Sequence, residues 1–114
     1  ALSPRVRALP RWTLSEDKRK ISTSFVARNW AEAMKYFNAL SVIAEEEGHH
    51  PDISLVNYRT VSVELTTHAV GGLTLPDLVL AAKLDAIPVE YSQKWLRDEG
   101  ASAYRQVDGA PAMK

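Results

Sequence analysis

The 114-residue chain carries 14 basic and 14 acidic residues, so its formal net charge is zero and it lacks the basic footprint of a protein that binds DNA or RNA directly. Its length predicts a single domain, and the absence of cysteine excludes disulfides, thiolate nucleophiles and cysteine-based zinc sites. No apolar run approaches the roughly 20 residues that span a bilayer, so we expect a soluble, cytoplasmic protein without membrane contact, with a nuclear or organellar location left open.

The first 26 residues predict a short helix followed by two strands. Ser3 can cap the helix, which should end before Pro10. Residues 12–14 and 19–26 predict strands joined by a polar hairpin loop. Apolar and polar residues alternate in the second of these strands, so we expect one of its faces to be covered.

A long helix is predicted between Asn29, a suitable N-cap, and Gly48, a suitable C-terminal glycine. Apolar residues that recur at spacings of three and four are expected to face the sheet: Trp30, Ala33, Met34, Phe37, Leu40 and Ala44. Further apolar residues lie on other faces of the helix: Tyr36, Ala39, Val42 and Ile43. One sheet contact would not use this much apolar surface, which indicates burial against another subunit.

Residues 53–56 and 60–67 predict two more strands, joined by a turn at 57–59. A second long helix follows, beginning at Thr74 and Asp77, which have the spacing of a capping box, and limited by Pro88. Its apolar residues form two stripes: Leu75, Leu78, Val79 and Ala82 on one, and Leu80, Leu84 and Ile87 on the other.

The predicted order is a short helix and then β-β-α-β-β-α. Such an order favours an α+β fold of two layers, a four-stranded antiparallel sheet with helices packed on one face. We predict one domain over residues 1–90 and a C-terminal extension over 91–114. The sequence predicts a helical turn or two near residues 91–96 of this extension and assigns it no functional role.

All three histidines lie around the second pair of strands. His49 and His50 directly precede the third strand, and because they are adjacent their side chains should diverge. His68 is predicted at the end of the antiparallel neighbouring strand, beside the start of the third, so His49 and His68 can converge. Imidazole has a pKa near 6.5 and can donate or accept a proton near neutral pH.

This segment resembles the signature of the pterin-4a-carbinolamine dehydratase family, which includes the dimerisation cofactor of a homeodomain transcription factor. The matching residues are Glu45, His49-His50-Pro51, Tyr58, His68 and Asp77, with Leu9-Pro10, Trp12 and Gly72-Leu73 in support. The resemblance covers roughly residues 3–88. Ala69 departs from the pattern of some relatives, which carry an acid there, and this changes the polarity expected of the pocket.

The resemblance implies a hydro-lyase, a 4a-hydroxytetrahydrobiopterin dehydratase that eliminates water from 4a-hydroxytetrahydropterin to give quinonoid dihydropterin during tetrahydrobiopterin recycling. The chemistry needs a proton donor and an acceptor but no metal and no redox cofactor. We expect His49 and His68 to be this pair, with His50 flanking the substrate and the choice of acid and base left open. Expected substrate-binding residues are Glu45, Pro51, Thr66, Thr67, Ala69 and Asp77. We expect Asp77 either to fix the tautomer of an imidazole or to bind the ring nitrogens of the pterin.

Other interpretations compete for these residues. Asp77 is equally well explained as a helix N-terminal carboxylate, and Glu45 as a surface residue. Three histidines and an aspartate could hold zinc, but adjacent histidines rarely serve one tetrahedral ion. The main alternative function, also implied by the resemblance, is a non-catalytic oligomeric binding module that acts as a transcriptional coactivator or assembly factor. In either case we expect a homodimer or homotetramer.

Overall fold

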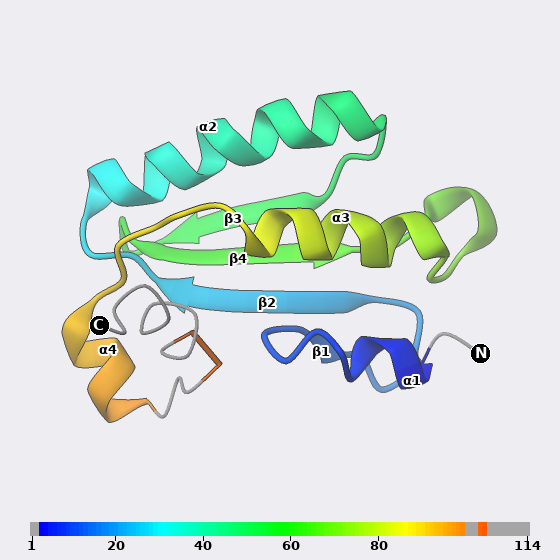
Figure 1. The fold of residues 1–114 in the computed structure, drawn as a ribbon, viewed down its shortest axis with the longest axis horizontal. Coiled ribbons are helices and arrows are strands. Elements are labelled where there is room, and N and C mark those ends of the chain that lie inside the picture. The colour runs from blue at the N-terminus through cyan, green and yellow to red at the C-terminus, as the bar shows by residue number, and fades with distance from the viewer. Residues whose placement is uncertain (1–2, 100–102, 105–114) are drawn as a thin grey trace.

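The computed structural model describes residues 3–99 and 103–104 as a two-layer α+β fold (Figure 1). Its elements are α1 (Ser3–Val6), β1 (Thr13–Leu14), β2 (Ile21–Val26), α2 (Trp30–Glu47), β3 (Asp52–Val56), β4 (Thr60–Leu65), a 3-10 turn η1 (His68–Val70), α3 (Leu75–Asp85) and α4 (Gln93–Asp98). The predicted order and fold class are confirmed. Within the described ranges, no helix is long and apolar enough to cross a bilayer.

The four strands form one antiparallel sheet in the order β1-β2-β4-β3, with β1 and β3 at its edges. In the central pair, Ile21 lies opposite Leu65 and Phe25 opposite Val61, and all four side chains are buried. The helices α2 and α3 lie on the same side of the sheet (Figure 1), and they cover the face that these apolar side chains form.

Helix α2 has the predicted ends, and its buried face includes Ala33, Leu40 and Ala44 of the predicted stripe but not the whole stripe. The side chain of Asn29 accepts a hydrogen bond from the backbone of Glu32, as an N-cap does. Trp30, in the first turn, is 55% exposed, so its predicted contact with the sheet is wrong. Tyr36 instead faces the sheet because its ring meets that of Phe25 edge-on, at a centroid distance of 4.9 Å.

Helix α3 buries only one of its two predicted stripes fully. Leu80 and Leu84 are buried as predicted, whereas Leu75 and Val79 are 50% and 39% exposed. The first stripe therefore leaves a partly apolar surface on the solvent side of the helix.

The described part of the C-terminal extension joins the main core. Tyr91, Leu96 and Tyr104 are all buried in the same apolar cluster as Phe25. The hydroxyl of Tyr104 donates to Thr23, whose own hydroxyl donates to the backbone carbonyl of Arg11. The short predicted helix near residues 91–96 is present as α4.

Candidate active site

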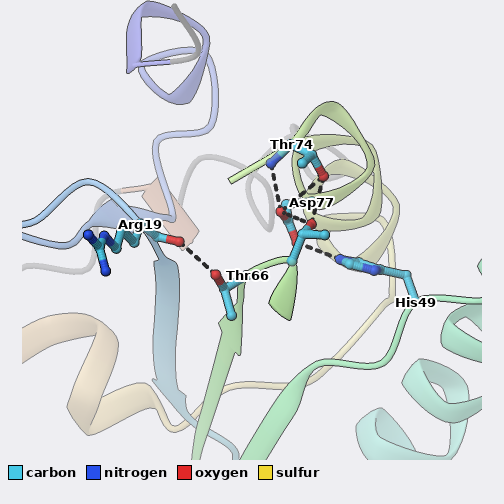
Figure 2. A network of polar contacts seen from close by, with 6 residues as sticks. Arg19, His49, Thr66, Thr74 and Asp77 are labelled. Atoms are coloured by element: carbon cyan, nitrogen blue, oxygen red, sulfur yellow. Dashed lines mark hydrogen bonds and ion pairs between the residues drawn. The ribbon is translucent and has the colours of Figure 1, made fainter. Parts of the chain in front are cut away.

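The end of helix α2 determines the direction in which the side chain of His49 points. Gly48 adopts a left-handed conformation, with φ at 62°, and the backbone N–H of His49 donates to the carbonyl of Ala44 at 3.1 Å. This cap turns the chain from the helix towards β3. The imidazole, 18% exposed, then points at α3, where Nε2 lies 2.5 Å from Oδ1 of Asp77 (Figure 2).

Asp77 is fully buried, and both of its carboxylate oxygens are engaged (Figure 2). Oδ1 meets His49, while Oδ2 accepts the hydroxyl of Thr67 at 2.7 Å and the backbone N–H of Thr74 at 2.9 Å. The bond from the Thr74 backbone is half of the predicted capping box. The two roles that the sequence left open for Asp77, helix capping and orientation of a histidine, therefore coexist.

Thr67 and Thr74 contact each other as well as Asp77. Their hydroxyl oxygens are 2.7 Å apart, across the loop that separates β4 from α3. The sequence indicated Thr74 only as a helix cap, so its participation beside the histidine was missed. The signal that could have found it is the threonine at position 67, which a loop of this length can bring back to the start of α3.

His50 turns away from His49, as adjacency predicts. Its Nε2 lies 3.2 Å from Oε2 of Glu45, in the last turn of α2. Both side chains are largely exposed, the imidazole by 63% and the carboxylate by 76%. The two adjacent histidines thus each face a separate carboxylate, one buried and one in solvent.

His68 does not end a strand, so that part of the prediction is wrong. Strand β4 stops at Leu65, and His68 begins the turn η1, which closes at Gly71 in a left-handed conformation. The side chain of His68 is exposed. Its convergence with His49 stays a prediction, supported by the bond from the adjacent Thr67 to Asp77.

The other predicted site residues do not join the hydrogen bonds of this centre. The hydroxyl of Thr66 donates to the backbone carbonyl of Arg19 at 2.7 Å, on the side away from Asp77 (Figure 2). Pro51 is half-buried and Ala69 is exposed. Across residues 3–99 and 103–104, no three histidine, aspartate or glutamate side chains gather as metal ligands would.

Comparison with known proteins gives one consistent family. The model of the family described as pterin 4 alpha carbinolamine dehydratase matches residues 1–87. The chain is 41% identical over 81 residues to pterin-4-alpha-carbinolamine dehydratase 2, mitochondrial, of Arabidopsis thaliana, covering 69% of this chain and 43% of that protein. It is 42% identical over 79 residues to a Halorhodospira halophila protein assigned to the same kind of dehydratase, covering 69% of this chain and 72% of that one.

A solved structure agrees with this result. The transcriptional coactivator/pterin dehydratase from Brucella melitensis matches with a TM-score of 0.70 at 29% identity, over 75% of this chain and 89% of that one. The chain therefore spans less than half of the plant relative but most of the bacterial ones.

Proposed function

The chain belongs to the pterin-4-alpha-carbinolamine dehydratase family of hydro-lyases, and we propose that its histidines carry the dehydration of 4a-hydroxytetrahydropterin. The observation that supports this most is the contact between His49 and a buried carboxylate at 2.5 Å. A carboxylate in this position fixes the orientation and the tautomer of an imidazole that must exchange a proton.

Because Nε2 of His49 contacts Asp77, Nδ1 is the ring nitrogen that can exchange a proton with the substrate. An ionised carboxylate only accepts hydrogen bonds, so Nε2 of His49 carries the proton in this contact. In the neutral imidazole Nδ1 is then unprotonated. We assign His49 as the base that removes the proton from the pterin ring nitrogen through Nδ1.

His68 is the proposed acid. Elimination needs a proton on the departing 4a hydroxyl, which then leaves as water while the ring nitrogen loses its proton, giving the quinonoid dihydropterin. An exposed imidazole can take up a proton from solvent after each turnover. His50 and Glu45 would flank the pterin, together with Pro51, Thr66 and Ala69. Asp77 has no free oxygen, which favours an orienting role over direct substrate binding.

The test is stopped-flow absorbance of freshly generated 4a-hydroxytetrahydropterin, with the parent and with His49→Ala and His68→Ala. Each variant should lose about 10²- to 10⁴-fold in rate, the usual contribution of a general acid or base, and should still unfold cooperatively. Asn38→Ala, on the exposed side of α2, is the matched control and should retain the parental rate. A His49→Ala or His68→Ala variant as fast as the parent would remove that residue from the mechanism.

We further propose that the protein works as a homodimer or homotetramer. Strand β3 is a sheet edge, and Ile53 and Val56 on it are 48% and 62% exposed. Val42, on α2, is 58% exposed. A second copy could pair with the unpaired backbone of β3 and cover these side chains. Sedimentation velocity should show that Ile53→Lys lowers the fraction of dimer or tetramer. An unchanged distribution of species would place the interface elsewhere.

A binding function is the second candidate, because the Brucella relative is named as a coactivator as well as a dehydratase. The stopped-flow assay separates the two. If the parent chain does not accelerate loss of water while remaining folded and oligomeric, the binding-module proposal takes precedence, and partner capture should be insensitive to His49→Ala.

A further inference from the structure

We propose that the hydroxyls of Thr67 and Thr74 form a two-step hydrogen-bond relay that holds Asp77 and, through it, keeps His49 in one tautomer. Both threonines are then positioning residues. Neither residue need touch the substrate. The inference rests on the proposed role of His49 as a proton acceptor.

The direction of the relay follows from counting protons. A threonine hydroxyl has one proton to donate. Thr67 uses its proton for Oδ2 of Asp77, at 2.7 Å, so in the contact between the two hydroxyls, also 2.7 Å, Thr74 must be the donor. The direct contact from the Thr74 hydroxyl to Oδ2 is longer, 3.4 Å, which agrees with this order.

The relay fixes which oxygen of Asp77 is left for His49. Oδ2 already receives two donors, the Thr67 hydroxyl and the Thr74 backbone N–H at 2.9 Å, so Oδ1 is the oxygen that accepts from Nε2. Because Asp77 is 0% exposed, water has no access to replace a lost donor. Removing one donor should therefore let the carboxylate rotate and loosen its hold on the imidazole.

Thr67 also connects Asp77 with the loop that contains His68, because its hydroxyl bonds to the carboxylate and its backbone bonds to the other end of the loop. Its backbone N–H donates to the carbonyl of Gly72 at 2.9 Å, and the N–H of Gly72 donates back at 3.3 Å. These two bonds close the base of the loop that contains η1. A single residue thus links the supports of the two proposed catalytic histidines, and its hydroxyl, used once as donor and once as acceptor, has no proton left for a pterin.

The variants Thr67→Val and Thr74→Val remove one step of the relay each, while Thr67→Ser and Thr74→Ser restore the hydroxyls. Thr60→Val, on β4 and away from the network, is the matched control. The first readout is ¹⁵N NMR of the histidine rings, assigned with His49→Ala and recorded well above the usual imidazole pKa of about 6.5. The parent should show His49 protonated at Nε2, the Val variants a mixture of both tautomers, and the Ser variants the parental spectrum.

The second readout is steady-state kinetics. Loss of a hydrogen bond to a charged group predicts a fall in kcat of about 10- to 100-fold for the Val variants, with KM unchanged. A rise in KM at constant kcat would mean that Thr67 binds substrate instead. Parental tautomer populations in both Val variants would overturn the relay.

The NMR result separates this inference from the proposed function. If the parent is not a dehydratase but His49 still loses its single tautomer in Thr67→Val, the relay stands and the assigned activity fails. A parent whose His49 carries its proton on Nδ1 overturns the relay whatever its activity.

Discussion

The two adjacent histidines differ more in their surroundings than in their place in the chain. His49 faces a carboxylate that is 0% exposed, whereas His50 faces one that is 76% exposed. Attraction between groups withdrawn from water is far stronger than between groups that water surrounds. His49 is therefore held in a fixed orientation, while the exposed His50 is free to change its orientation.

Replacing Asp77 by Asn should prevent His49 from acting as a base while keeping a side chain of the same size in place. The carboxylate accepts from Thr67, from the backbone of Thr74 and, in the proposed tautomer, from His49, but an amide presents an acceptor on one side and a donor on the other. If the amide N–H faces His49, the imidazole must accept at Nε2 and its Nδ1 becomes protonated. We expect the dehydration rate to fall about 10²- to 10⁴-fold in stopped-flow absorbance.

The opposite orientation of the amide, with its oxygen towards His49, is also unfavourable, since the amide N–H would then face the donors from Thr67 and Thr74. The free energy of unfolding should therefore drop by roughly 1–3 kcal/mol. Asp52→Asn, an exposed carboxylate on β3, controls for the loss of charge and should match the parent in both measurements. Parental kinetics in Asp77→Asn would show that the tautomer of His49 does not limit the reaction.

Sequence reasoning reached the partners of His49 but not their full arrangement. Adjacency predicted that His49 and His50 diverge, and the cap spacing placed Asp77 at the start of a helix. The bond between Thr67 and Thr74 depends on how the loop closes between residues 67 and 72, which no periodic pattern encodes. For the same reason His68 was predicted at the end of a strand. In the structure β4 stops at Leu65, and the carbonyl of Thr67 accepts hydrogen bonds from the backbone N–H groups of Val70 and Gly72 instead of from a neighbouring strand.

At the scale of elements, the end of α2 decides where His49 points. The helix stops because Gly48 enters the left-handed region, and the next residue already carries the imidazole that reaches α3. Backbone conformation at one position thus connects the longest helix to the site.

Gly48→Ala should therefore weaken both the fold and the site. An added Cβ at Gly48 meets nothing within 4 Å, so the cost is purely conformational, arising from φ at +62°. We expect a loss of about 1–2 kcal/mol in the free energy of unfolding, measured by urea denaturation. Gly72→Ala is the matched control, because its Cβ also has open space but its φ is not positive. Equal stabilities of the two variants would refute the argument.

The ends of the elements were more predictable than the faces they bury. Asn29 and Gly48 marked the limits of α2 because capping chemistry is local. The choice between Trp30 and Tyr36 was not local, since it depends on which side chain meets Phe25 across the layer. Both are large amphipathic aromatics, and helical spacing alone cannot rank them.

At the scale of the whole molecule, the C-terminal segment completes a core that the first 90 residues begin. The ring of Tyr104 lies 5.8 Å from that of Phe25 and 5.1 Å from that of Tyr91. The guanidinium of Arg11 sits 4.3 Å from the Tyr104 ring centre, a cation–π contact. Sequence patterns assigned this segment no role because its buried residues are spaced too irregularly to form a stripe.

This buried aromatic cluster predicts a loss of stability in alkali. Burial raises the pKa of Tyr36 and of Tyr104 above the ordinary value of 10.0. Below pH 10 both phenols are protonated in the folded and unfolded chains and contribute nothing to the pH dependence. Above it the unfolded chain loses protons that the folded chain retains, so the free energy of unfolding must fall as pH rises. Urea denaturation on both sides of pH 10 should show this fall in the parent and a shallower one in Tyr36→Phe and Tyr104→Phe, because each variant lacks one buried phenol. If the free energy of unfolding falls with pH equally steeply in the parent and in both variants above pH 10, the loss of stability in alkali arises outside this cluster.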